Sequence, residues 1–403
     1  MSRPLLPWAA LAVLGAVSLA WLGLLGFVFT DYELEAAPAL DALVRGWWSE
    51  FLALSPAYGG SLIMRAPFAL GAHALGGGDV AVFRAVGMPC LLAGSALGVV
   101  LAGSLLARKA GRGTVAAVVL LCAANPITLR ALDIGHPEEL LGAALCAGAV
   151  LAGVRDRPAL AGVLLGLALA NKAWAVLAVG PVLLALPSGR WRALGIAGAI
   201  AGAIMLPLLL SASPSATPGA AAQTNEIFQP WQVWWFLGSA GEVIRGGDGL
   251  VKEGYRAAPG WLSPISHPLI VAVAVPLTLL AWRRRSDPLL LLALLFMLRC
   301  VLDPWNTDYY ALPAIMALVT WESTRGEHMP VWTLALTFAT WATWQWVVRA
   351  APPDVEALVY LGWSLPFVGL LAWRLYAPAL PAGAAAMPAL NRGGRASVWS
   401  TTQ

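Results

Sequence analysis

Long apolar runs separated by short polar stretches recur along the whole chain. Four of these runs, at residues 11–29, 86–106, 193–212 and 331–348, contain no charged residue. About 20 consecutive apolar residues are enough for a helix to cross the hydrocarbon core of a bilayer. Lipid offers no partner to backbone N–H and C=O groups, so such segments must satisfy these groups internally, as helices do. The pattern therefore predicts an all-α, polytopic membrane protein.

The same pattern places about twelve transmembrane helices within a single transmembrane domain, residues 1–376. The first apolar stretch is longer than the usual secretory core of about 7–15 residues and no small-residue cleavage site follows it, so we interpret it as an uncleaved helix. The expected crossings are residues 8–29, 86–107, 113–129, 138–154, 158–171, 173–187, 192–212, 264–282, 287–302, 309–321, 330–349 and 355–374.

Composition and charge agree with this class and add a topology. The 403 residues are 59% hydrophobic and only 11% charged, so lipid must be the main solvent, and a net charge of +4 is weak evidence for a nucleic-acid partner. Twelve crossings place both termini on one side, and more than half of the 25 basic residues then fall in short loops there. The positive-inside rule predicts that this side is cytoplasmic, as in a multi-pass protein of the bacterial plasma membrane.

Two long segments face the outer side and are predicted to contain interfacial helices. In the first, apolar residues at helical spacing between positions 40 and 52 are opposed by Asp41 and Arg45, which predicts one amphipathic helix. In the second, Trp231 and Trp235 are either interfacial anchors or a wall for a lipid-borne acceptor. Residues 377–403 are rich in Ala, Gly, Pro and Ser and are predicted to be a disordered cytoplasmic tail.

Asn171 and Lys172 form the tip between two short predicted helices. Each helix has about 14 residues, or about 21 Å of length, against about 30 Å of hydrocarbon. Lys172 should therefore stop below the outer surface, where an ammonium ion is costly unless it meets an anion or a water-filled cavity. An anionic ligand and snorkelling to the interface both remain open.

A second polar cluster runs from Arg130 through His136 to Glu138 and Glu139. Two carboxylates in the first turn of a helix are well explained by the helix dipole alone. A cation and an imidazole facing the same outer cavity as Lys172 would also suit recognition of a sugar or a phosphate. Both interpretations stay open.

A third cluster, which contains Arg299, Asp308 and Tyr309, follows the predicted helix 287–302. It serves equally well to start the next helix and to contact a substrate. Arg299 lies in an apolar run near a helix end, where it needs either the interface or an anionic partner.

Asp31 follows the first predicted helix directly, and Glu33 and Glu35 come soon after it. Carboxylates in this position are most often solvated loop charges, although a catalytic role is an alternative. The chain has no P-loop, zinc-ligand motif, nucleophile elbow or dinucleotide fingerprint, so nucleotide-dependent chemistry is not expected.

Two motifs resemble those of the multispanning family 87 glycosyltransferases of the GT-C group. They are Gly135-His-Pro-Glu-Glu-Leu-Leu-Gly142 and Arg157-Pro-Ala-Leu-Ala-Gly-Val-Leu-Leu-Gly-Leu-Ala-Leu-Ala-Asn-Lys172-Ala-Trp174, and the stretch from Asp303 to Tyr310 also fits. The likeness covers about residues 25–325. It departs at Gly135–Glu138, where many members carry a Gly-Gln-x-Asn-like stretch.

The resemblance implies a GT-C-like membrane glycosyltransferase that uses a polyprenyl-phosphate sugar, as actinobacterial mannosyltransferases of lipoglycan synthesis do. It implies mannose as the sugar, a lipid or glycan acceptor on the outer face, inversion at the sugar carbon, and no metal or other cofactor. In that group a carboxylate just after the first helix is the catalytic base. Asp31 occupies this position, with Glu33 and Glu35 as the alternatives.

Further roles follow as expectations. Lys172, Arg299, Asn171, His136 and Arg130 would bind the donor. The residues expected near the acceptor are Trp231, Trp235, Asp308 and Tyr309. A transporter or flippase of polyprenyl-linked sugars or small solutes is the rival function, but it would more often carry ionisable residues at mid-membrane.

Overall fold

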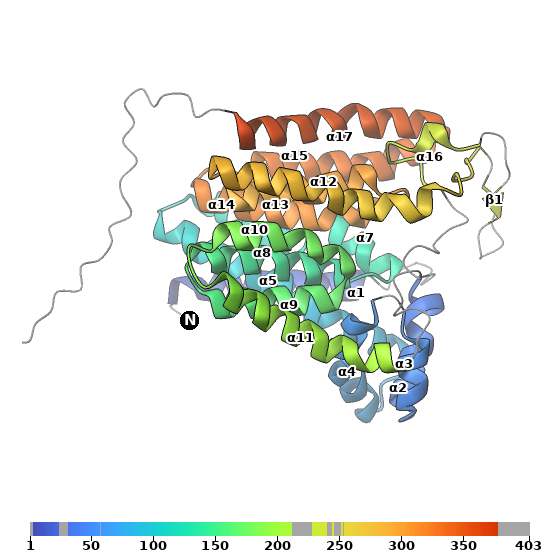
Figure 1. Cartoon of the computed structure of the whole chain (residues 1–403). Coiled ribbons are helices and arrows are strands. Elements are labelled where there is room, and N and C mark those ends of the chain that lie inside the picture. Colours follow the sequence, from blue (N-terminus) through green and yellow to red (C-terminus); the bar gives the residue numbers. More distant parts are fainter. Residues whose placement is uncertain are drawn as a thin grey trace, which may run out of the picture.

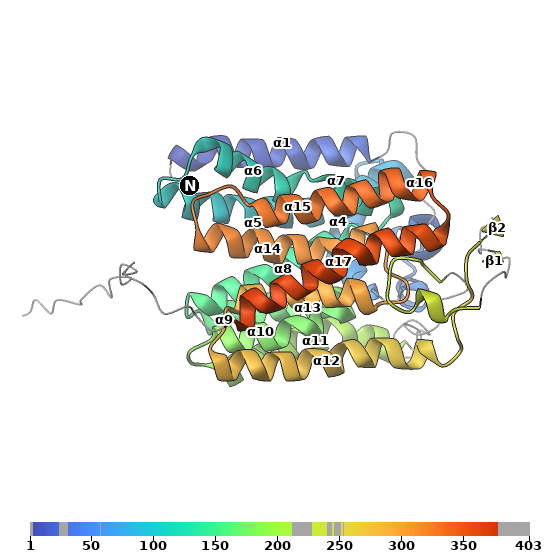
Figure 2. The same cartoon turned by 90° about the horizontal axis from the view of Figure 1, so that it is seen from above.

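The computed structural model describes residues 3–23, 31–56, 58–211, 228–239, 244–245, 251–252 and 254–377. Its long helices lie side by side in one bundle (Figures 1 and 2). In chain order they are α1 (Leu6–Leu22), α5 (Asp79–Ala107), α6 (Arg112–Ala123), α8 (Glu138–Val154), α9 (Pro158–Asn171), α11 (Arg190–Leu210), α12 (Leu262–Arg284), α13 (Pro288–Leu302), α14 (Leu312–Arg325), α15 (Val331–Ala342) and α17 (Pro353–Tyr376).

The remaining elements begin, extend or connect these helices. They are η1 (Arg3–Leu5), the π-helical turn η2 (Tyr32–Ala36), α2 (Ala37–Val44), α3 (Trp48–Leu54), α4 (Gly59–Ala74), α7 (Pro126–Ile134), η3 (Ala173–Ala178), α10 (Val179–Ala185), η6 (Trp235–Leu237), η7 (Asp308–Ala311), η8 (Thr343–Val347) and α16 (Val348–Ala350). The two-residue strands β1 (Ile244–Arg245) and β2 (Val251–Lys252) pair antiparallel. The predicted all-α class is confirmed apart from this pair.

Each of the twelve predicted crossings overlaps one to three helical elements, although residues 24–29 of the first crossing lie outside the described residues. Within the described residues, five stretches are long and apolar enough to span a bilayer: Asp79–Ala107, Arg112–Ile134, Arg190–Leu210, Pro264–Arg284 and Pro353–Tyr376. In Arg190–Leu210 only 17% of the apolar window is buried. An apolar surface left uncovered by protein fits a lipid environment. The chain is a membrane protein, and the count of about twelve crossings stays a prediction.

The loops predicted to be cytoplasmic gather at one end of the bundle, where the N-terminus also lies (Figure 2). Arg108 donates to the backbone carbonyls of Ser323 and Thr324, and Arg325 pairs with Asp287. The hydroxyl of Ser188 donates to Asp156. These contacts join loops that are distant in sequence, as the predicted alternation of helix direction requires.

The prediction of one amphipathic helix over residues 40–52 is wrong. The chain forms α2 and α3 instead, and between them Gly46 has a φ of +80°. A positive φ is easily reached by glycine and interrupts a right-handed helix. Helix α4, which follows, was not predicted from the sequence.

Helices α9 and α11 pack closely because glycine and alanine face each other. Gly162 and Gly166 are four residues apart on one face of α9, opposite Ala193 and Ala197 of α11. A Cβ atom on Gly166 would lie 2.7 Å from the carbonyl oxygen of Ala197. Small residues at this spacing let helix backbones approach one another in membranes.

We predict that Gly166→Ala lowers the free energy of unfolding by about 1–3 kcal/mol, because the added methyl group must separate α9 from α11. Gly198→Ala is the matched control on α11, since a Cβ atom there meets nothing within 4 Å. Thermal unfolding in detergent measures both variants. Equal stability of Gly166→Ala and Gly198→Ala would contradict this packing.

Candidate active site

The start of α8 places two carboxylates inside the bundle. Helix α7 ends at Ile134, and Gly135 follows in a left-handed conformation with a φ of +103°. The chain then turns through His136, and Glu138 and Glu139 form the first turn of α8. Both glutamates are completely buried. Two adjacent buried carboxylates must be paired with cations to stay ionised.

Glu138 has three cationic neighbours from three parts of the chain. Its carboxylate lies 2.8 Å from Nδ1 of His136, 3.1 Å from Nζ of Lys172 and 3.4 Å from Nη2 of Arg65. Arg65 belongs to α4 and is itself buried. Glu138 therefore joins α4, the α7–α8 turn and the end of α9.

Glu139 binds the remaining cation of the cluster. It lies 3.0 Å from Nζ of Lys172 and 3.4 Å from Nη1 of Arg299, and it accepts a hydrogen bond of 3.1 Å from Nε1 of Trp174. The guanidinium of Arg299 also faces the rings of Trp174 and Tyr310, at 5.0 Å and 4.2 Å. Arg299 thus finds the anionic partner that its apolar surroundings require.

The joint between α9 and η3 holds Lys172 and Asn171 in place. Lys172 has an extended backbone, and its ammonium lies 4.8 Å from the ring of Tyr58. Asn171 donates to the backbone carbonyl of Glu138 at 2.8 Å and accepts from the hydroxyl of Ser61 at 2.7 Å. The short arms expected on both sides of this tip are confirmed. Two protein carboxylates supply the anion that Lys172 needs.

Asp31 lies at the exposed edge of the cluster. Its Oδ2 atom is 3.2 Å from Nε2 of His136, while 36% of the Asp31 side chain is exposed. Glu33 is exposed, and none of the hydrogen bonds or ion pairs found among the described residues joins it to the cluster. We call Arg65, His136, Glu138, Glu139, Lys172, Arg299 and Asp31 the charge network.

His136 decides the formal charge of the network. The other members are three carboxylates and three basic side chains, from two arginines and one lysine. Burial and the nearby Lys172 ammonium lower the pKa of His136. The Glu138 carboxylate and the hydrogen bonds to Asp31 and Glu138 raise it by more than this, so that the pKa of His136 is about 9. His136 is therefore an imidazolium at neutral pH.

Three other predicted site residues border the network. Arg130 donates from Nε to Asp308 at 2.8 Å, and it lies 3.9 Å from Asp133. The ring of Tyr309 lies 5.0 Å from that of His136. Arg130 is the most exposed of the predicted donor-binding cations, with 37% of its side chain accessible.

Trp231 and Trp235 lie elsewhere and are buried. The backbone carbonyl of Trp231 accepts from Asn306, and Nε1 of Trp235 donates to Asp354. Neither contacts a member of the network in the hydrogen bonds, ion pairs and ring contacts found among the described residues. Their predicted acceptor role stays a prediction.

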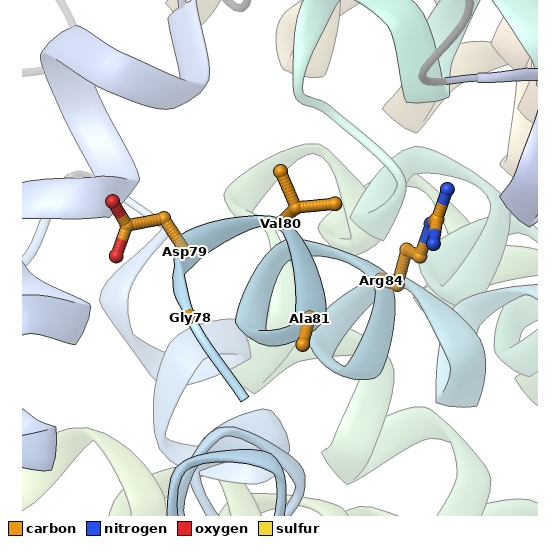
Figure 3. Close-up of a pocket in the computed structure, with 5 residues that line it drawn as sticks. All are labelled: Gly78, Asp79, Val80, Ala81 and Arg84. Atoms are coloured by element: carbon orange, nitrogen blue, oxygen red, sulfur yellow. The ribbon is translucent and has the colours of Figure 1, made fainter. Parts of the chain in front are cut away.

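An open pocket of about 560 Å³ lies at the start of α5, where Gly78, Asp79, Val80, Ala81 and Arg84 line it. Figure 3 shows the side chains of Asp79 and Arg84 at opposite ends of the segment that lines this pocket. Phe83 precedes Arg84 in the chain, and the centroid of its ring lies 4.9 Å from that of Tyr32. The pocket therefore lies near the segment that begins with Asp31, and it contains no member of the network.

The sequence model of glycosyltransferase family 87 matches residues 60–304, which is more than half of the chain. The chain belongs to glycosyltransferase family 87. No curated protein matches it. The matched region holds every member of the network except Asp31.

Membership makes this protein a membrane glycosyltransferase, so the transporter alternative is set aside. Such an enzyme uses a sugar donor and an acceptor. Among the described residues, no three His, Cys, Asp or Glu side chains are grouped so that they could hold a metal ion.

Sequence reasoning missed two features of the site in this glycosyltransferase. Arg65 was not predicted to be a site residue, although an arginine within the apolar stretch that forms α4 indicates a functional position. Glu138 and Glu139 were noticed, but the helix dipole explained them without any partner. The burial of both side chains is what identifies them as the centre of the site.

We predict that Glu139→Gln lowers the free energy of unfolding of the glycosyltransferase by about 3–5 kcal/mol, because Lys172 and Arg299 lose the charge they share. Asp41→Asn is the control. It breaks an exposed pair with Arg45 and should cost less than about 1 kcal/mol. Thermal unfolding in detergent compares the two. A Glu139→Gln protein as stable as Asp41→Asn would mean that the buried ions are not paired as described.

Stability should also depend on pH through His136. Its pKa is higher in the folded protein than the usual 6.5, so the contribution of its charge is complete below about pH 6.5 and is lost as the pH rises through about 9. The difference in melting temperature between the wild type and His136→Gln should decrease as the pH rises through this range. The decrease should correspond to at most about 3 kcal/mol in the free energy of unfolding. A difference that is independent of pH would contradict the imidazolium assignment.

Proposed function

We propose that this glycosyltransferase moves a sugar, mannose, from a polyprenyl-phosphate donor to a lipid or glycan acceptor on the outer face, with inversion at the sugar carbon. The observation that carries the proposal is the position of Asp31. It is an exposed carboxylate held at the edge of a cluster that also contains Lys172, Arg299 and Arg65. A base and a set of cations are the two parts that such a transfer requires.

The charge of the network supports a phosphodiester donor. With His136 protonated, its four cations exceed its three carboxylates by one formal charge. A polyprenyl-phosphate sugar carries one negative charge on its phosphate, so its binding would neutralise the site. Preorganised cations also stabilise the charge that develops on a departing phosphate oxygen.

The proposed reaction is a single displacement. The acceptor hydroxyl oxygen attacks the anomeric carbon, and the bond from this carbon to the phosphate oxygen breaks on the opposite face. The electron pair leaves with the phosphate, and Asp31 takes the proton of the acceptor hydroxyl. This resembles the base half of an inverting glycosidase, whereas the phosphate leaves without needing a general acid. No metal or other cofactor enters these steps.

Five residues are assigned to the donor. Lys172, Arg299 and Arg130 are assigned to the donor phosphate, with His136 and Asn171 beside them. Because Lys172 and Arg299 are already paired with Glu138 and Glu139, the phosphate would share these cations with protein carboxylates. This sharing limits donor affinity and favours release of the product phosphate.

Four residues are assigned to the acceptor side. Asp308 and Tyr309 lie beside Arg130 and His136 and are the nearer pair. Trp231 and Trp235 would act from the neighbouring outer segment. The assignment of Glu33 as an alternative base is less well supported than that of Asp31, since Glu33 has no contact with the network among the described contacts.

The proposed topology has about twelve crossings with both termini in the cytoplasm of a bacterium. The contacts of Arg108, Arg325 and Ser188 support it because they gather the basic loops at one end of the bundle. The charge network lies at the other ends of the same helices, at the start of α8 and the end of α9 and α13. The active site would then face outward, and residues 377–403 would be a cytoplasmic tail.

We predict that Asp31→Asn lowers turnover by about 10²–10⁴-fold, because asparagine keeps the shape and polarity of the side chain but cannot take the acceptor proton. Binding of labelled polyprenyl-phosphate mannose should persist. The assay uses purified protein in lipid with the lipid fraction of host membranes as acceptor, and Asp41→Asn as a control that keeps normal turnover.

Glu33→Gln tests the alternative base in the same assay. If Asp31→Asn transfers sugar at the normal rate and Glu33→Gln does not, the base lies two positions further along. If both variants keep normal turnover, the acid–base mechanism proposed here is wrong.

We predict that reporter domains fused after Arg108, Arg155, Arg192 or Arg283 give a cytoplasmic signal. Fusions within residues 212–264 should give an external signal, because that segment lies between two predicted crossings of opposite direction. An external signal from the fusion after Arg192 would overturn the assignment in which α9 runs toward the outer side and α10 runs back to the cytoplasmic side.

A further inference from the structure

The imidazole of His136 is held by a different carboxylate at each ring nitrogen. Nδ1 lies 2.8 Å from Oε1 of Glu138, and Nε2 lies 3.2 Å from Oδ2 of Asp31. Glu138 is completely buried at the start of a long helix, whereas the side chain of Asp31 is 36% exposed. One end of this chain of three groups is therefore fixed in the core, and the other reaches the accessible edge of the site.

Two tyrosine rings also contact the imidazole ring. Tyr309 lies on it at 5.0 Å with an angle of 33° between the rings, and Tyr58 meets it edge-on at 5.4 Å. The other charged group close by is Lys172, which shares Glu138 with His136. The imidazole is therefore held by a carboxylate at each nitrogen and by contacts with two aromatic rings.

The backbone of the Asp31 segment rests directly on the turn that carries His136. A Cβ atom on Gly135 would lie 2.6 Å from both the amide nitrogen and the Cβ atom of Tyr32. Only glycine permits this approach, and its φ of +103° is one that other residues rarely adopt. This close approach also brings Asp31, which precedes Tyr32, next to His136, which follows Gly135.

We propose that His136 is a positioning residue that holds Oδ2 of Asp31, so that the other carboxylate oxygen is presented to the acceptor hydroxyl. Glu138 acts through His136, because Glu138 sets the orientation of the imidazole ring, and this ring sets the orientation of the Asp31 carboxylate. This inference rests on the proposed function, in which Asp31 is the base. It differs from the donor-phosphate role assigned to His136 above, since both ring nitrogens are already occupied by carboxylates.

Two substitutions separate positioning from a purely structural role. The amide nitrogen of Gln can occupy the place of Nε2 and still reach Asp31, whereas that of Asn can occupy the place of Nδ1 and reach only Glu138. If His136 positions Asp31, His136→Asn should lower kcat by up to about 100-fold, since a displacement of about 1 Å at the reacting groups can cost that much. His136→Gln should keep most of the turnover.

The assay measures kcat and the KM for labelled polyprenyl-phosphate mannose with purified protein in lipid, and His73→Asn serves as an exposed histidine control. The expected result is a loss in kcat for His136→Asn with little change in KM. A rise in the KM for the donor with kcat unchanged would make His136 a donor ligand and overturn the proposal. Equal losses for Asn and Gln would assign it a structural role and also overturn it.

A second readout does not depend on how well the Asn variant folds. The neutral imidazole keeps its one hydrogen on Nδ1, which faces the closer and fully buried Glu138, so Nε2 then has no hydrogen for Asp31 and the wild type should lose turnover on the alkaline side of its kcat–pH profile. Gln does not titrate, so this limb should be absent from His136→Gln. An alkaline limb that is identical in both proteins would contradict the positioning role.

The double variant distinguishes failure of this inference from failure of the proposed function. In the Asp31→Asn background, His136→Asn should cause little further loss, because there is no base left to position. If Asp31→Asn alone keeps normal turnover, the proposed function fails. If Asp31→Asn is inactive and His136→Asn alone has a normal kcat, Asp31 remains the base and only the positioning role is lost.

Discussion

Two adjacent carboxylates buried at the start of α8 impose the central constraint on this protein. Removing ionised Glu138 and Glu139 from water costs several kcal/mol for each unless cations and hydrogen bonds replace the lost hydration. The replacements come from α4, the α9–η3 joint and α13, as Arg65, Lys172 and Arg299. These elements must therefore converge on one turn, and this convergence fixes the end of the bundle where the site lies.

The same constraint accounts for the proposed catalytic geometry. Once Glu138 is held by cations, it can hold His136, and His136 reaches Asp31 at the accessible edge. The network by itself carries one net positive formal charge, which a donor with a single negative charge would neutralise. In this account the buried carboxylates act on the reaction only through the groups that they orient. Asp31 alone exchanges a proton with the substrate.

The helical class and the positions of most long helices followed from the sequence because each depends on local apolar pattern. The short helices on both sides of Lys172 were also predictable, since the basic loops that bound them set their lengths. The ion pairs were not predictable from local pattern, because they join positions 33, 73 and 160 residues apart. Glu138 and Glu139 had a sufficient local explanation in the helix dipole, and Gly46 gave too little signal to predict the break between α2 and α3. Asp31 was indicated by family resemblance, and its contact with His136 required the structure.

The central claim is that one carboxylate base supports a single displacement at the sugar carbon. The most direct test is the anomeric configuration of the product. Purified wild-type protein in lipid is supplied with labelled polyprenyl-phosphate mannose and the lipid fraction of host membranes, and the new linkage is analysed by nuclear magnetic resonance. The account predicts a linkage of the configuration opposite to that of the donor. A product that retains the donor configuration would contradict it, because retention requires a second displacement and a nucleophile that this site is not proposed to contain.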